Sequence, residues 1–81
     1  MEAHHEHEIH IIIDKKPYTA PKPVMTGTEL RALAHPVIGP QRDLFLVVPG
    51  HDDEKIANDQ PVALKSGMHF YSAPATINPG A

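Results

Sequence analysis

The 81-residue sequence predicts an α+β domain in which one helix covers one face of a mixed sheet of four or five strands. Two strongly apolar strand patterns, at residues 8–14 and 43–48, and a helix signal between them carry this prediction. The helical connection is long enough to cross the sheet, so the first and last strands are expected to lie parallel at its centre.

The first strand pattern, at residues 8–14, is dominated by β-branched side chains, which favour extended structure. Alternation places three residues on one face of the strand: Ile9, Ile11 and Ile13. His10 and Ile12 point to the opposite face. A strand this apolar is expected near the centre of its sheet.

A turn at residues 14–17 follows, and Tyr18–Ala20 can return as a short second strand. Proline lacks a backbone donor, so neighbouring prolines confine this strand to a sheet edge: Pro17, Pro21 and Pro23.

The helix is predicted over residues 26–35. Thr26 can cap it, and Glu29 three residues later completes a capping box. Apolar residues then recur at helical spacing and form one stripe facing a core: Leu30, Leu33 and Ala34. Pro36 disfavours helical geometry in the residue before it, which ends the helix near His35.

The second half of the chain supplies a strong strand at 43–48 and shorter extended pieces at 55–56, 61–64 and 68–71, separated by turns. Within residues 43–48, Leu44, Leu46 and Val48 share one face of the strand, and Phe45 and Val47 share the other.

Composition excludes several functions. The chain has no cysteine, which removes disulfides, thiolate metal sites and cysteine nucleophiles. Its net charge is −3 and its seven Lys and Arg residues are scattered, so no nucleic-acid partner is expected. No apolar run approaches the roughly 20 residues that span a bilayer, and no signal-peptide order is present, so we expect a cytoplasmic protein without a membrane partner.

Catalysis and metal binding are not expected either. Ser66, Ser72 and seven histidines occur, but no nucleophile, base and orienting acid are clustered, so the chain is not predicted to be an enzyme or to need a cofactor. The weak metal candidates are His4, His5 and His7, interleaved with glutamates. No distant partner ligand with clear spacing appears, and a solvated segment is the preferred interpretation.

The chain divides into a polar His-rich segment at 1–8, a folded domain at 9–72 and an extended C-terminal segment at 73–81. The last segment has no charged side chain, and its prolines oppose a helix. Its notable residues are Pro74, Asn78, Pro79, Gly80 and Ala81.

A single helix covering one face of such a sheet is the ubiquitin-like β-grasp arrangement, and it leaves the other face open. Four blocks of the sequence resemble the bacterial multiubiquitin-type domain, and the resemblance runs from about Ile9 to Gly80: Ile13–Tyr18, Thr26–Ala34, Asp43–Gly50 and Gly67–Pro74. That family is similar to ubiquitin in fold and occurs in operons beside E1-like, E2-like and JAB-type peptidase proteins.

The resemblance implies a bacterial modifier that an E1-like enzyme activates and an E2-like enzyme attaches to a target protein through an isopeptide bond. Gly80 carries over as the conjugated residue. Ala81 follows it, so a JAB-type peptidase is expected to remove Ala81 first. Pro79 departs from the pattern, because ubiquitin has a second glycine there.

By similarity to the hydrophobic patch of ubiquitin, a partner-binding patch is expected on the open face at Phe45, Val47, His69 and Tyr71. The core positions of the second half of the chain would then be Leu44, Leu46, Val48, Met68 and Phe70. Loops covering Phe45 and Val47 would be the simpler alternative. Two other functions stay open: a self-associating scaffold module forming homo-oligomers, and a sulfur carrier. Sulfur carriers end in Gly-Gly, which Pro79-Gly80-Ala81 does not match.

Overall fold

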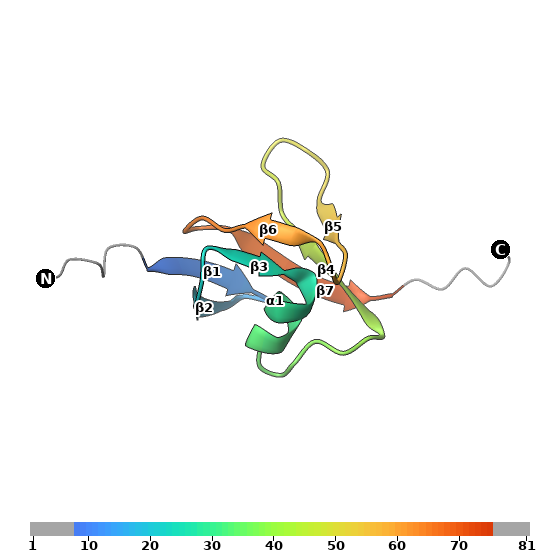
Figure 1. Cartoon of the computed structure of the whole chain (residues 1–81). Helices are drawn as coiled ribbons and strands as arrows, with labels where there is room; N and C mark the ends of the chain where they lie inside the picture. The colour runs from blue at the N-terminus through green and yellow to red at the C-terminus, as the bar shows by residue number, and fades with distance from the viewer. Residues whose placement is uncertain (1–7, 76–81) are drawn as a thin grey trace, which may run out of the picture.

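The computed structural model of the chain describes residues 8–75, and they contain one helix and seven strands. Five strands form a mixed sheet in the order β2-β1-β7-β4-β5. The helix α1 (Gly27–Leu33) lies on one face of this sheet (Figure 1), so the predicted α+β, ubiquitin-like β-grasp fold is confirmed. The strands of the sheet are β1 (Ile9–Ile13), β2 (Lys16–Ala20), β4 (Arg42–Leu46), β5 (Glu54–Ile56) and β7 (His69–Pro74).

The first and last strands, β1 and β7, lie parallel and side by side at the centre of the sheet, as predicted. The Ile12 amide donates to the Met68 carbonyl at 2.9 Å, and the Asp14 amide donates to the Phe70 carbonyl at 3.0 Å. On its other side β7 pairs antiparallel with β4. The strand that leads into the C-terminal segment is therefore bonded on both sides.

β1 and β2 form a hairpin whose two-residue turn consists of Asp14 and Lys15, with φ angles of 51° and 71°. Two consecutive residues with positive φ match the twist of a tight hairpin. β2 lies at the edge of the sheet, as predicted, and there the missing donor of Pro17 is tolerated.

The helix starts as predicted but ends early. Thr26 caps it: its hydroxyl accepts the Glu29 amide at 3.3 Å, while the Glu29 carboxylate accepts the Thr26 amide at 2.9 Å. The last helical residue is Leu33, two residues before the predicted end. The His35 amide donates to the Tyr18 hydroxyl at 2.9 Å and not to a carbonyl of the helix. His35 therefore lies outside the hydrogen-bonded helix.

A second, two-stranded sheet joins β3 (Val24–Thr26) to β6 (Pro61–Ala63) in antiparallel register. The sequence predicted the extended piece at 61–64 but not its partner strand. Met25 pairs with Val62, and both side chains are buried in the same core as Leu30. The helix N-terminus is thus anchored by sheet pairing directly before it.

The core lies between α1 and the inner face of the large sheet. Alternation along β1 is confirmed, because Ile11 and Ile13 are fully buried while His10 is exposed. Leu46 and Met68 are only partly buried, although they pack against the core. The predicted core position of Val48 is wrong: β4 ends at Leu46, and Val48 lies beyond it, half-buried. The largest fully buried side chains are Ile11, Ile13, Leu30, Leu44, Ile56 and Phe70.

The last strand is longer than predicted. β7 runs to Pro74, past the expected strand end at residue 71 and the expected domain end at residue 72. Asp43 pairs with Ala73 and Arg42 pairs with Pro74, so β4 supports the extension. Pro74 lacks a backbone donor, so the sequence suggested that the strand ends before it. In the structure Pro74 still pairs with a residue of the neighbouring strand β4.

Candidate functional site

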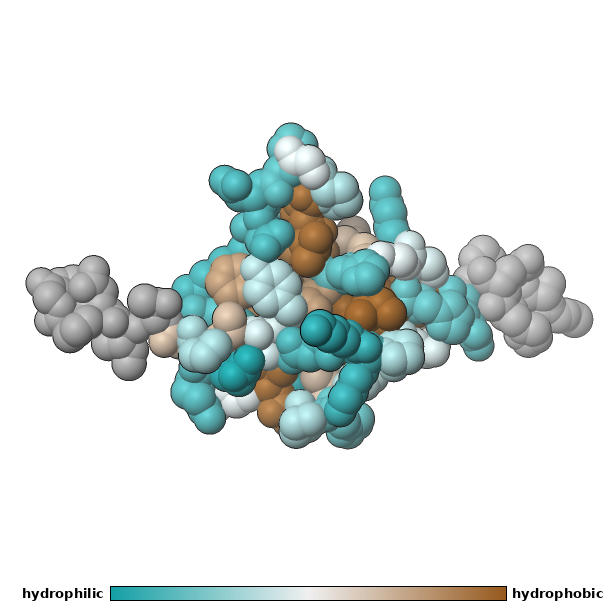
Figure 2. Space-filling view, turned by 180° about the vertical axis from the view of Figure 1, so that it is seen from behind, coloured by the Kyte–Doolittle hydropathy of each residue, from teal (hydrophilic) through white to brown (hydrophobic). Residues whose placement is uncertain are grey.

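The outer face of the sheet, opposite α1, gathers the predicted patch residues. Phe45 and Tyr71 are direct cross-strand partners in β4 and β7. Val47 directly follows β4, and its amide donates to the His69 carbonyl at 2.9 Å. The structure therefore brings Phe45, Val47, His69 and Tyr71 together on one surface. Figure 2 views the molecule from behind and shows apolar side chains among polar ones on this side.

The two aromatic rings of the patch are stacked. The Phe45 and Tyr71 ring centroids lie 5.2 Å apart, with an angle of 15° between the planes. The Tyr71 hydroxyl donates to an Asp53 carboxylate oxygen at 2.5 Å. This hydrogen bond stabilises the protonated phenol, so it raises the pKa of Tyr71, and partial desolvation adds to the effect. The ring pair is thus tied to the loop before β5.

One patch residue was missed in the sequence analysis. Ile12 pairs with His69 across β1 and β7, and its side chain points to the outer face. It lines the same shallow hollow as Val47, His69 and Tyr71. A signal for it existed, because alternation already places Ile12 opposite the core-facing isoleucines. We call the five residues Ile12, Phe45, Val47, His69 and Tyr71 the outer patch.

The patch is not covered by the loops of residues 8–75. Val47 keeps 40% of its surface exposed, and Ile12, Phe45 and Tyr71 are of intermediate burial. A second shallow hollow adjoins the first one and shares Val47 and His69 with it. The two hollows make one continuous, mostly apolar surface across β1, β7 and β4.

Three side chains meet where β7 leads into the C-terminal segment. The Asp14 carboxylate accepts the Ser72 amide through Oδ1 and the Ser72 hydroxyl through Oδ2, each at 2.7 Å. Arg42 donates from Nε to the Ser72 hydroxyl at 3.0 Å and from a terminal nitrogen to the Ser72 carbonyl at 2.9 Å. We call Asp14, Arg42 and Ser72 the Ser72 clamp. No local sequence signal points to it, because its members lie far apart in the chain.

The predicted C-terminal residues fall mostly beyond the described part. Pro74 is exposed at the end of β7, and the Ala75 amide donates to the Gln41 carbonyl at 2.8 Å. Asn78, Pro79, Gly80 and Ala81 lie outside residues 8–75. The clamp and the Ala75 bond are thus the last described contacts before the predicted conjugation residue.

The weak metal candidates His4, His5 and His7 also lie outside the described residues. Within residues 8–75, no group of three or more His, Asp or Glu side chains is arranged to hold a metal ion. The hydroxyl of Ser66 bonds the His10 amide and the Glu8 carbonyl, and that of Ser72 belongs to the clamp. Both hydroxyls therefore have structural partners.

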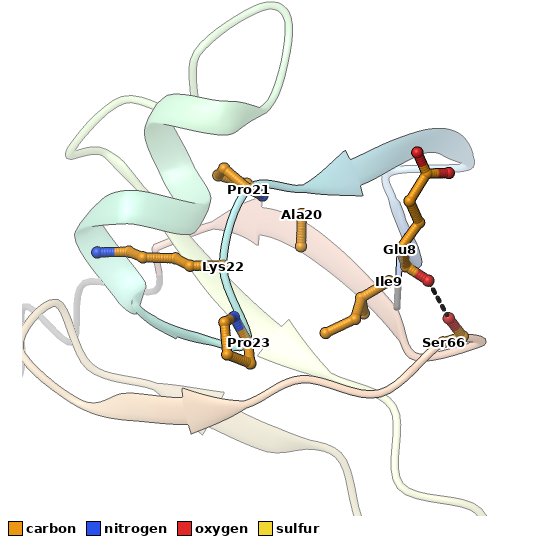
Figure 3. A pocket seen from close by; sticks show the side chains of 7 residues that line it. All are labelled: Glu8, Ile9, Ala20, Pro21, Lys22, Pro23 and Ser66. Atoms are coloured by element: carbon orange, nitrogen blue, oxygen red, sulfur yellow. Dashed lines mark hydrogen bonds between the residues drawn. The ribbon is translucent and has the colours of Figure 1, made fainter. Parts of the chain in front are cut away.

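A further pocket lies at the opposite end of the sheet, beside the start of β1 (Figure 3). Its lining residues are Glu8, Ile9, Ala20, Pro21, Lys22, Pro23 and Ser66. Lys22 pairs with Glu29 at 2.5 Å, and the Ser66 hydroxyl donates to the Glu8 carbonyl at 3.4 Å. These polar groups are used within the fold, and the pocket adds nothing to the candidate site.

The comparisons with known proteins agree with the fold. A family model described as multiubiquitin matches residues 9–74. No curated protein and no solved structure matches the chain. For the part of the chain that the structure describes, no helix is long and apolar enough to cross a membrane.

Proposed function

Because the chain belongs to the multiubiquitin family, we propose that it is a ubiquitin-like protein modifier conjugated through Gly80. A JAB-type peptidase hydrolyses the Gly80–Ala81 peptide bond and exposes the Gly80 carboxylate. An E1-like enzyme and ATP convert this carboxylate to an acyl adenylate with release of pyrophosphate. A cysteine thiolate of the E1-like enzyme then displaces AMP and forms a thioester.

The acyl group next passes to an E2-like cysteine by thioester exchange. A lysine amine of a target protein finally attacks the acyl carbon, an isopeptide bond forms and the E2 thiol is released. Every step takes place on partner enzymes, and this chain supplies the carboxylate and the surfaces that present it. The use of ATP makes the cytoplasm the expected compartment.

The observation that carries the proposal is the position of β7. It is the last strand of the fold, lies at the sheet centre and is bonded on both sides. It ends at Pro74, at one end of the folded body (Figure 1). A folded body whose last strand is bonded on both sides, followed by a segment without charged side chains, suits delivery of a carboxylate into an enclosed active site.

The outer patch is the proposed recognition surface for the E1-like and E2-like enzymes. Its exposed apolar and aromatic groups are of the kind that anchor protein interfaces. It lies on β1, β4 and β7, the strands that also carry the Ser72 clamp or adjoin it. A partner on this face would lie close to the start of the C-terminal segment.

The test is to incubate the protein with its cognate E1-like enzyme and ATP, with and without Ala81. The chain contains no cysteine, so a reducible adduct reports a thioester on the enzyme. We expect an adduct only for the form that ends at Gly80, and only with ATP. Failure of that form to give an adduct would refute conjugation.

The exposed outer patch also favours a second function, a self-associating module that is not conjugated. Val47 and the stacked Phe45–Tyr71 pair could then face a second copy. Sedimentation velocity over a range of concentrations tests this alternative. It requires concentration-dependent association that Phe45→Ser abolishes and that persists without any partner enzyme.

A further inference from the structure

We propose that the Ser72 clamp sets the length of chain over which Gly80 can reach, so that Asp14, Arg42 and Ser72 act as positioning residues for activation. This inference rests on the proposed function, because reach matters only if an enzyme must receive the Gly80 carboxylate. The clamp itself is a feature of the described residues and can be measured without any enzyme.

The clamp engages each backbone and side-chain polar group of Ser72. Its amide and hydroxyl donate to the two oxygens of Asp14, while its hydroxyl and carbonyl accept from Arg42. All four bonds involve an ionised group, which makes them stronger than neutral hydrogen bonds. A guanidinium and a carboxylate therefore hold a single residue of β7 from opposite sides.

The clamp lies where β7 loses one of its neighbours. β1 ends at Ile13, and the Asp14 amide makes the last backbone bond of the β1–β7 ladder, to the Phe70 carbonyl. The Asp14 carboxylate accepts the next outward amide, that of Ser72, in place of a strand. The Asp14 side chain therefore holds β7 at one position beyond the last backbone hydrogen bond between β1 and β7.

In residues 73–75, the described part of the chain beyond Ser72, the backbone pairs with β4 and with the residue before it. Ala73 and Pro74 pair with Asp43 and Arg42, and the Ala75 amide bonds the Gln41 carbonyl. Pairing on one side at the end of a strand opens readily. Arg42 is both a clamp residue and the partner of Pro74, so loss of the clamp weakens this pairing directly.

The consequence is a defined reach. With pairing intact to Ala75, Gly80 is the fifth residue after the last anchored position, and this stretch spans at most about 17 Å. If the chain opens back to Ser72, eight residues are available, and the limit rises to about 27 Å. The clamp therefore determines whether the stretch between the last anchored residue and Gly80 is short or long.

The first experiment measures amide hydrogen exchange at Ala75 in the full chain. Ser72→Ala removes the hydroxyl bonds, and Asp14→Gly removes the carboxylate while keeping a residue that accepts positive φ. We call the variant with both substitutions the clamp variant. In it we expect amide exchange at Ala75 to accelerate at least about tenfold, while the exchange rate of the Phe70 amide stays unchanged.

Ser66→Ala is the matched control, since it removes the same kind of hydroxyl at the opposite end of the sheet. Ser66 also links the start of β1 to the turn before β7 (Figure 3), but there its hydroxyl bonds two backbone groups, the His10 amide and the Glu8 carbonyl. Exchange at Ala75 should equal wild type in this control. Equal exchange in the clamp variant would overturn the inference.

The second experiment shortens this stretch. In the form ending at Gly80, deletion of Thr76 and Ile77 lowers the greatest distance that the chain can span between Ala75 and Gly80, with the clamp intact, to about 10 Å. We expect this deletion to lower kcat/KM for thioester formation at least about tenfold, and the clamp variant to restore it. A purely structural role cannot produce rescue, because removing hydrogen bonds would then only add to the defect.

The outcomes separate the two proposals. In one outcome, the clamp variant fails to restore thioester formation in the deleted form while wild type forms the thioester normally. That result refutes the proposal that the clamp sets the reach of Gly80, but it does not refute conjugation. Absence of a thioester in every form refutes conjugation and the proposal about reach with it. The exchange measurement in that case still shows whether the clamp holds the start of the segment.

Discussion

Phe45 and Tyr71 stack across β4 and β7 at a centroid distance of 5.2 Å, at the centre of the face that the helix leaves open. Aromatic stacking of this kind contributes about 0.5–1.5 kcal/mol beyond the area it buries. Both rings are only partly buried, so the pair is available for contacts outside the domain.

Phe45→Ala is expected to weaken binding of the E1-like enzyme at least about tenfold while lowering the free energy of unfolding by only about 1 kcal/mol. Calorimetric titration and urea denaturation measure the two effects. Val24→Ala is the control, because Val24 is 48% exposed but lies on β3, away from the outer patch. Equal loss of binding in both variants would contradict the assignment of the outer patch.

Asp53→Asn is expected to lower the pKa of Tyr71, because the hydrogen bond to the carboxylate is the main cause of its raised value. A raised pKa in the folded state contributes stability below the unfolded value of 10.0, and this contribution is lost as the pH rises through the folded value. An NMR titration of the Tyr71 ring checks the shift. An unchanged titration midpoint would show that Asp53 is not its cause.

Glu29 gives the opposite pH dependence. The Lys22 ammonium and then the Thr26 amide lower the pKa of the Glu29 carboxyl. Its contribution is therefore present above the ordinary value of 4.5 and is lost as the pH falls through the lower folded value. Glu29→Gln should flatten that part of the stability profile, as measured by urea denaturation between neutral and acidic pH. A profile that keeps its slope would rule out this pairing as the source.

Thr26→Ala removes the side-chain cap of α1 and is expected to lower the free energy of unfolding by about 1 kcal/mol. The hydroxyl accepts the Glu29 amide and forms one half of the capping box, whose other half is the Glu29 carboxylate on the Thr26 amide. Thr28→Ala, which removes a hydroxyl bonded to the Asn58 carbonyl, serves as the comparison. A larger loss in Thr28→Ala than in Thr26→Ala would argue against the capping account.

Gly27→Ala should lower the free energy of unfolding by about 1–3 kcal/mol, although alanine favours helices. A Cβ at Gly27 would lie 2.2 Å from the Ala57 carbonyl oxygen, so the helix start or the turn at 57–60 must move. At Gly39 the nearest atom belongs to the flexible Gln41 side chain, and Gly39→Ala should be tolerated. Thermal melts compare the two, and equal melting temperatures would contradict the close packing.

Local signals in the sequence predicted most of the fold. The alternation from Ile9 to Ile13 and the Thr26–Glu29 capping box depend on neighbouring residues only, and both are confirmed. β3 escaped prediction because three residues with a distant partner give no periodic pattern. The helix was predicted to reach His35, but the His35 amide donates to the hydroxyl of Tyr18 in β2. A contact with a separate strand leaves no signal in the local sequence.

The candidate site was predicted in part. Alternation along β4 and β7 indicated which side chains share the open face, and the structure adds Ile12 through its pairing with His69. The Ser72 clamp could not be found in this way. Asp14 and Ser72 are 58 positions apart, and only the parallel pairing of β1 and β7 brings them together.

The parallel pairing of β1 and β7 also determines how the domain responds to mechanical force. The chain enters at the start of β1 and leaves at the end of β7, so a pull on the two ends loads this ladder in shear (Figure 1). Its backbone bonds and the Asp14–Ser72 bonds must then break together instead of one after another. Since forced unfolding is governed by the unfolding rate, the domain should resist a pull on its two ends for longer than its modest size suggests.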